Sequence, residues 1–184
     1  MANRCTHIPE IMLPREGTDL SKWAVIACDQ YTSQPEYWAE TDRTVGDAPS
    51  TLRLTLPEVY LEENDVAERT EQIHRTMHQY IEDGTLRTLP AGVILTERWS
   101  GGSCPRRGIV MAVDLEAYEY TPGSASLIRP TEKTVVERIP PRLKVRQGAC
   151  IELPHIMILI DDPDRQIIEP LFDQTAKLEK VYDT

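Results

Sequence analysis

The amino-acid sequence predicts an α/β (α+β) fold in which helices flank a mixed β-sheet. One observation is a long segment, Asn64–Asp83, that repeats apolar residues on one helical face. Another is a set of short apolar runs with the length of strands. These runs stand at Trp23–Cys28, Gly92–Glu97, Arg107–Leu115 and His155–Ile160. Because no linker or internal repeat interrupts the chain, we expect a single domain over residues 1–184.

Helix boundaries are predicted from capping residues. Asn64 is a favourable N-cap, and Gly84 follows the same segment in the usual C-cap position. The segment Pro35–Val45 starts with a proline where a first helical residue should stand, and acidic residues occupy its first turns. A last helix is expected at Gln174–Tyr182. It reaches the end of the chain without a cap, so we expect the chain to be the front portion of a longer protein.

The strands are predicted from apolar patterning. Trp23–Cys28 and His155–Ile160 are continuously apolar, which is typical of buried strands. Leucines alternate with polar residues over Leu52–Leu56, the period of a half-buried strand. Gly92–Glu97 and Arg107–Leu115 are separated by glycine and serine residues, so they are expected to form an antiparallel hairpin with a roomy loop.

Composition favours a cytoplasmic protein. No apolar stretch approaches the roughly 20 residues that span a bilayer, and the N-terminus lacks the pattern of an export signal. The four cysteines are scattered singly, which excludes a Cys-x-x-Cys zinc or redox motif and suits free thiols in a reducing compartment. A formal net charge of −10 disfavours direct DNA binding, because the phosphates would be repelled. The composition is also compatible with a homo-oligomer.

A basic segment between Ser126 and Gly148 is the exception to this acidic composition. It carries six basic residues against Glu132 and Glu137, a local formal charge of +4. The basic residues are Arg129, Lys133, Arg138, Arg142, Lys144 and Arg146. Whether Arg142–Arg146 forms a helix or a strand, Arg142 and Arg146 project to the same side. The alternative interpretation is a solvated basic face without a ligand.

This segment concentrates the side chains that bind phosphates or carboxylates. Guanidinium groups offer planar forks of donors, and threonine hydroxyls add further hydrogen bonds. The predicted ligand-binding residues are Arg129, Thr131, Thr134, Arg138, Arg142 and Arg146. Glu132 or Asp161 is the expected catalytic acid or base. Asp161 and Asp162 are also the expected metal ligands, since they follow a predicted buried strand and ligands often bind beyond the ends of such strands. The alternative for Asp161 and Asp162 is a plain turn before Pro163.

Other candidate residues are assigned structural roles. His74 and His78 have the spacing of helical metal ligands, but Arg75 stands where a zinc-peptidase helix has glutamate, so ordinary histidines are favoured. Asp29 also follows a predicted strand, and it would share a cleft with Asp161 and Asp162 if the two strands were neighbours. Cys104, next to Ser100–Ser103 in the hairpin loop, is expected to be unreactive because no histidine partner is evident.

Four strings of the sequence resemble a known family. They are Trp23–Trp38 (WAVIACDQYTSQPEYW), Pro49–Leu61 (PSTLRLTLPEVYL), Ser126–Arg146 and Leu153–Pro163 (LPHIMILIDDP). In this order they resemble the bacterial and archaeal domain of unknown function 1015. Some members are labelled as similar to partition proteins of the ParB type, whose wider fold includes sulfiredoxin and binds nucleotides. The resemblance therefore implies a distant similarity to that fold, and family members are typically about twice as long.

The resemblance also implies a polar signature, an acid and a threonine followed by spaced arginines. In this chain the signature falls on Glu132, Thr134, Arg138 and Arg142. Many members have a histidine before the glutamate, where this chain has Thr131, so a histidine base at that position is disfavoured. The leading hypothesis is binding of a phosphorylated small molecule or nucleotide, with Mg²⁺ and phosphotransferase activity. The alternative is a non-catalytic module that senses a ligand or binds a protein.

Overall fold

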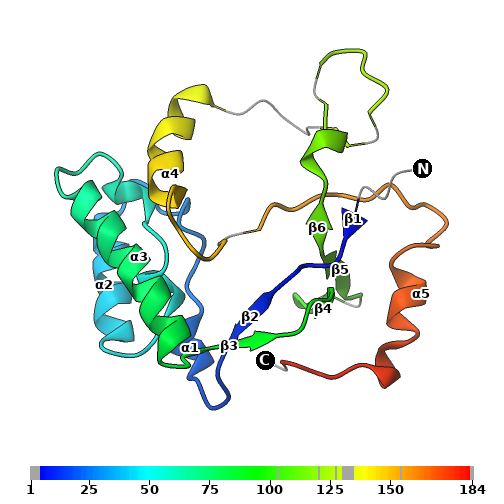
Figure 1. The fold of residues 1–184 in the computed structure, drawn as a ribbon, viewed down its shortest axis with the longest axis horizontal. Helices are drawn as coiled ribbons and strands as arrows, with labels where there is room; N and C mark the ends of the chain where they lie inside the picture. Colours follow the sequence, from blue (N-terminus) through cyan, green and yellow to red (C-terminus); the bar gives the residue numbers. More distant parts are fainter. Residues whose placement is uncertain are drawn as a thin grey trace. The chain divides into compact units, whose positions relative to one another are not determined.

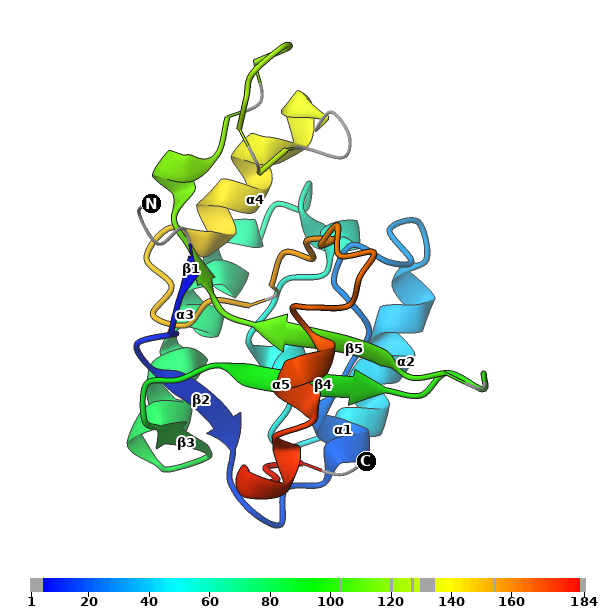
Figure 2. The same cartoon turned by 90° about the vertical axis from the view of Figure 1, so that its right-hand side faces the viewer.

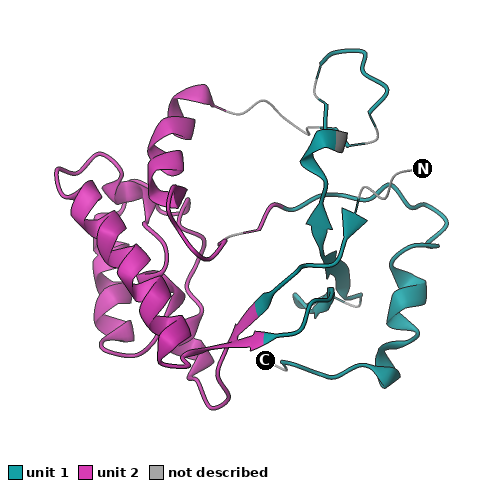
Figure 3. Cartoon of the chain, viewed as in Figure 1, with its two compact units in different colours: residues 1–11, 89–131, 157–184 teal, residues 12–88, 132–156 magenta. Residues whose placement is uncertain are grey.

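A computed structural model describes residues 5–102, 104–119, 121–126, 128–129, 135–153 and 155–182 (Figure 1). The chain divides into two compact units, drawn in two colours in Figure 3. Unit 1 comprises Met1–Ile11, Leu89–Thr131 and Met157–Thr184. Unit 2 comprises Met12–Thr88 and Glu132–Ile156. Each unit is thus built from separate stretches of the sequence, and Thr131, Glu132 and Thr134 lie outside the described residues.

Unit 2 is helical. Its α-helices are α1 (Leu20–Trp23), α2 (Pro35–Val45), α3 (Val66–Glu82) and α4 (Ile139–Arg146). Its short 3₁₀ helices are η1 (Thr51–Arg53), η2 (Glu58–Tyr60) and η4 (Val136–Arg138). The two longest helices confirm the sequence predictions. Pro35 opens α2. The N-cap of α3 is Asp65, so the prediction of Asn64 as N-cap is wrong, and the helix ends at Glu82 shortly before Gly84, whose φ of +72° suits a residue without a side chain.

The core of unit 2 forms where α3 packs on the segments around it. A cluster of buried side chains holds these elements together. It comprises Trp23, Leu54, Leu56, Ile73, Met77, Tyr80 and Leu86. Ser50 is fully buried beside it. Its backbone N–H donates to the Tyr80 hydroxyl at 3.2 Å, and its own hydroxyl donates to the Trp23 carbonyl at 3.2 Å, so its polar atoms are satisfied without water.

The strands form three two-stranded sheets in the described residues. The strands are β1 (Cys5–Thr6), β2 (Ile11–Pro14), β3 (Leu86–Leu89), β4 (Ile94–Arg98), β5 (Arg106–Val110) and β6 (Ala112–Val113). β1 pairs with β6, β2 with β3, and β4 with β5. β4 and β5 are antiparallel with Ile94 opposite Val110, which confirms the predicted hairpin. The α+β class is confirmed, with separate small sheets in place of one mixed sheet.

A short helix covers the hairpin of unit 1. Figure 2 shows α5 (Glu169–Phe172) across β4 and β5. The Arg107 guanidinium lies 4.8 Å from the centroid of the Phe172 ring, and the same side chain donates to the Glu97 carboxylate at 2.9 Å. Arg107 therefore links α5 to β5, and its ion pair with Glu97 links β5 to β4.

Three predicted strands and one predicted helix are wrong. Trp23 ends α1, because the Asp19 side chain accepts the Ser21 N–H and starts a helix there. Leu54 and Leu56 are buried, but they follow the 3₁₀ helix η1 instead of lying on a strand. The run His155–Ile160 pairs with no strand among the described residues, and its apolar side chains are exposed, Ile156 by 86%. At Gln174–Tyr182 only η5 (Thr175–Lys177) is helical.

Within the ranges that the structure describes, no helix is both long enough and apolar enough to cross a bilayer.

Candidate functional site

The basic segment contains helix α4, which settles its conformation around Arg142. Pro140 and Pro141 stand in the first turn of α4, where a missing backbone N–H costs no hydrogen bond. Arg142 and Arg146 are four residues apart on this helix, so they lie on the same face. The sequence predicted this shared direction for both conformations that it left open, and the structure selects the helix.

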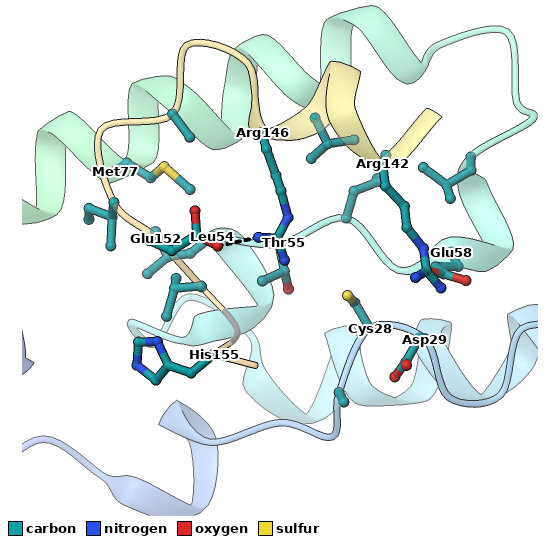
Figure 4. A pocket seen from close by; sticks show the side chains of 17 residues that line it. Cys28, Asp29, Leu54, Thr55, Glu58, Met77, Arg142, Arg146, Glu152 and His155 are labelled. Carbon is teal, nitrogen blue, oxygen red and sulfur yellow. Dashed lines mark hydrogen bonds and ion pairs between the residues drawn. The ribbon is translucent and has the colours of Figure 1, made fainter. Parts of the chain in front are cut away.

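Both arginines line a pocket within unit 2 that has a volume of about 280 Å³. Figure 4 shows their guanidinium groups extending from α4, with Cys28 and Asp29 on the segment across the pocket. The apolar part of the lining comes from α3, from α4 and from the segments that follow η1, η2 and α4. These side chains are Leu54, Leu56, Leu61, Met77, Val145, Ile151 and Leu153. The pocket therefore combines an apolar wall with charged groups, as small-molecule sites commonly do.

Arg142 is held by an acid that the sequence analysis did not select. Its guanidinium lies 2.5 Å from the Glu58 carboxylate, whose side chain is 10% exposed while that of Arg142 is 41% exposed. The Nε atom of Arg142 is buried and finds no hydrogen-bond partner among the described residues. An unsatisfied buried N–H is costly, so this atom lowers the stability of the Arg142 conformation.

Arg146 forms a second ion pair on the pocket wall. Its guanidinium donates to the Glu152 carboxylate, and both side chains are about half exposed. A guanidinium has five N–H donors, so one carboxylate leaves several of them available. Each arginine is thus oriented by a glutamate while it retains donors for an incoming anion.

Cys28 and Asp29 occupy the segment after α1. Burial raises the pKa of the Cys28 thiol, and the nearby Glu58 and Asp29 carboxylates raise this pKa further. The thiol is therefore protonated near neutral pH, which makes it a poor nucleophile. The Asp29 carboxylate accepts a hydrogen bond from Gln30 Nε2 at 3.2 Å. Asp29 lines the pocket, whereas Asp161 and Asp162 belong to unit 1.

The position of α4 is secured by a histidine of α3. His74 Nε2 donates to the carbonyl of Val145 at 2.9 Å, in the last turn of α4. The chain then turns at Gly148, whose φ of +91° favours glycine, and a Cβ atom there would stand 3.5 Å from the His74 ring. His74 thus has a packing role. His78 is exposed, and the described residues contain no group of three or more potential metal ligands.

Arg129 and Arg138, two more of the predicted ligand-binding residues, are not among the residues that line this pocket. Arg138 is exposed in η4 and does not line it. Arg129 belongs to unit 1, where its Nε donates to the Ser126 carbonyl at 2.9 Å. Of the predicted set, the structure brings Arg142 and Arg146 together.

The predicted metal site lies in unit 1. The Asp162 carboxylate accepts the backbone N–H groups of Gln166 and Ile167 at 2.9 and 2.8 Å, and these hydrogen bonds lower the pKa of Asp162. Both carboxylate oxygens are therefore engaged in a turn, which was the alternative interpretation of this pair. Asp161 is exposed.

Several pocket residues were missed by sequence reasoning. Glu58, Glu152 and His155 all line the pocket, and none of them was a predicted site residue. Glu58 and His155 do fall within two of the strings that carry the family resemblance, Pro49–Leu61 and Leu153–Pro163. Their place in these strings was the sequence signal that could have identified Glu58 and His155 as site residues.

Comparisons with known proteins support one assignment. No curated protein and no solved structure matches the chain. A family model described as "Protein of unknown function (DUF1015)" matches residues 12–184, which include every residue that lines the pocket. The match covers far more than half of the chain and agrees with the resemblance of the four strings. The chain therefore belongs to the DUF1015 family.

Proposed function

We propose that the unit 2 pocket binds a small phosphorylated molecule and that Arg142 and Arg146 hold its phosphate. One observation carries this proposal: two guanidinium groups project from the same face of α4 into one pocket. Paired arginines suit a phosphate because their planar donor forks match its oxygens.

The size of the pocket favours a small ligand. Its volume of about 280 Å³ is at the lower end of the roughly 300–1,000 Å³ that ligand sites usually have. A phosphorylated metabolite suits this volume better than a complete nucleotide. The apolar wall, which includes Leu56, Met77 and Ile151, would contact the carbon part of such a ligand.

The glutamates on the pocket wall bear on the affinity. Glu58 and Glu152 each neutralise one arginine when the pocket holds no anion. A phosphate must share these guanidiniums with the carboxylates, and moderate affinity is therefore expected. In return, each glutamate holds its arginine in place before the ligand arrives, which reduces the entropy lost on binding.

The proposed reaction is transfer of the phosphoryl group with Mg²⁺. Phosphoryl transfer depends on positioning and on neutralised charge, and the two arginines would supply part of both. A ligand sensor would use the same contacts without turnover. Incubation with phosphorylated metabolites, nucleotides and Mg²⁺, followed by ³¹P NMR, distinguishes the two, because a transferase produces a new phosphorus signal.

Binding is tested by thermal shift with a panel of phosphate monoesters and nucleotides. We expect at least one monoester to raise the melting temperature of the wild type, since a ligand at a hundred times its Kd stabilises by about 2.7 kcal/mol. Arg142→Ala and Arg146→Ala should abolish the shift. Lys144→Ala is the matched control, because Lys144 is an exposed cation of α4 that does not line the pocket.

Two results would contradict the proposal. One is the absence of a shift with every phosphorylated compound. The other is a shift that Arg142→Ala and Arg146→Ala retain in full. Arg142→Lys keeps the positive charge of arginine but loses its planar donor fork, so a phosphate monoester should raise the melting temperature of this variant by less than it does for the wild type. This intermediate shift shows that the loss of the shift in Arg142→Ala does not come from misfolding. Circular dichroism of each variant establishes that it is folded.

A further inference from the structure

The ionic lining of the pocket contains more carboxylates than its arginines neutralise. Arg142 and Arg146 face Asp29, Glu58 and Glu152 on the same pocket. Glu58 and Glu152 are each paired with one arginine. Asp29 forms no ion pair with any cation in the part of the chain that the structure describes, and its carboxylate accepts a hydrogen bond from the neutral amide of Gln30. A site for a simple anion would gain nothing from this third negative charge.

Asp29 lies across the pocket from the two arginines. Figure 4 shows Asp29 beside Cys28 on the segment across the pocket from α4, while the guanidiniums extend from α4. The carboxylate of Asp29 contributes to the raised pKa of Cys28, which places its charge close to that thiol. A ligand whose phosphate contacts the arginines would therefore present its other end to Asp29.

We infer that the ligand is a phosphate monoester that also carries a protonated primary amine, with the phosphate held by Arg142 and Arg146 and the ammonium group held by Asp29. This inference rests on the proposed function and names its substrate class. An ammonium group has three donors and a positive charge, so it satisfies a carboxylate that the chain leaves without a cation. Compared with a monoester that lacks the amine, a ligand of this class brings one negative charge fewer into a pocket that already has an excess carboxylate.

The test compares two ligands of the same size by isothermal titration calorimetry. O-Phosphoethanolamine and n-propyl phosphate have the same number of heavy atoms. The first ends in an ammonium group, and the second ends in a methyl group at the same position. We expect the wild type to bind O-phosphoethanolamine about two- to fivefold more tightly, the range that an ion pair with an exposed carboxylate provides. Equal affinities overturn the amine inference and leave the phosphate site intact.

Asp29→Asn removes the charge with little change of shape. In this variant the two ligands should bind equally, and n-propyl phosphate should bind as it does to the wild type, which shows that the pocket is preserved. Asp47→Asn is the matched control, since Asp47 is exposed in the same unit and does not line the pocket. A preference that survives Asp29→Asn overturns the role of Asp29.

Two further outcomes are decisive. If neither monoester binds and no other phosphorylated compound does, the proposed function fails and this inference falls with it. Vesicles that contain phosphatidylethanolamine present a phosphodiester with the same ammonium group on a lipid. We expect no binding to them, because a cavity of about 280 Å³ encloses a free metabolite. Vesicle binding that Asp29→Asn abolishes would instead assign the pocket to a lipid headgroup.

Discussion

The carboxylate of Glu58 lies 2.5 Å from the guanidinium of Arg142, and 10% of the Glu58 side chain is exposed to solvent. Glu58 comes from η2 and Arg142 from α4, so the contact joins two elements that are far apart in the sequence. A carboxylate with so little exposure is stable as an anion because the cation stays next to it. The pair therefore has a structural role as well as a role in the pocket.

The first prediction concerns the energy of this pair. Arg142→Ala should lower the free energy of unfolding by about 1–3 kcal/mol, because it leaves the Glu58 carboxylate poorly hydrated and without its cation. Glu58→Ala should be similar, and the double variant should lose less than the sum of the two. A double-mutant cycle measured by urea unfolding should give a coupling of about 1–2 kcal/mol.

The pair Arg43 and Glu40 provides the control cycle. It lies on the surface of α2 with side chains that are 72% and 65% exposed, so its coupling should be below about 0.5 kcal/mol. Equal coupling energies in the two cycles would contradict the structural role of Glu58.

The second prediction concerns the anchor of α4. His74→Ala removes the hydrogen bond to the Val145 carbonyl and should lower the free energy of unfolding by about 1 kcal/mol. It should also weaken phosphate binding, because the helix that carries both arginines is held less firmly. His78→Ala, on the exposed side of α3, should change stability by less than about 0.5 kcal/mol and leave binding unchanged. Indistinguishable effects of the two variants would refute the anchoring role.

The third prediction uses Cys28 as a reporter of the pocket. Its raised pKa and its partial burial should make it react with iodoacetamide more slowly than the exposed Cys5, Cys104 and Cys150. Its rate should still increase above pH 9.0, the ordinary value for a thiol, because the protonated form persists to higher pH.

A bound phosphate monoester should protect Cys28 and leave the three exposed cysteines unaffected. Peptide mass spectrometry resolves the four sites in one sample, so the exposed thiols serve as internal controls. Labelling of Cys28 as fast as Cys150, or unchanged in saturating ligand, would argue against the pocket geometry.

The fourth prediction is a pH dependence that arises from Tyr80. Burial raises the pKa of this hydroxyl above its ordinary value of 10.0. As the pH rises past 10, the unfolded chain releases this proton before the folded chain does, so the free energy of unfolding should fall. The stabilising contribution is complete below pH 10 and is lost as the pH approaches the raised pKa.

Tyr80→Phe isolates this effect. The variant should lose the corresponding part of the alkaline slope, and at neutral pH it should be less stable by about 1 kcal/mol, since the Ser50 N–H loses its acceptor. Unfolding curves of both proteins between pH 8 and 11 provide the measurement. A slope that is the same in the two proteins would exclude Tyr80 as its source.

The helices were the most predictable part of the fold because their signals are local. Pro35 begins α2, and the apolar period of α3 ends before Gly84, so neighbouring residues alone define these boundaries. Apolar runs gave poorer predictions. Leu54 and Leu56 are buried as their apolar character suggests, but burial does not specify a strand when a 3₁₀ helix buries the same side chains.

The site was half predictable for a related reason. The spacing of Arg142 and Arg146 places both on one side of any regular element, and the structure agrees. Their partners could not be inferred in the same way. Glu58 reaches Arg142 through the tertiary packing of unit 2, and no local pattern encodes that contact.

The exposed run Ile156–Ile160 has a consequence for the behaviour of this chain in solution. An extended, apolar and uncharged segment is a template on which other chains can add strands, and this one leaves five apolar side chains exposed by 46–86%. Asp161, Asp162 and Pro163 follow it directly. Two charges and a residue without a backbone N–H interrupt such stacking, so they act as gatekeepers against aggregation. We expect colloidal stability to depend on these three residues.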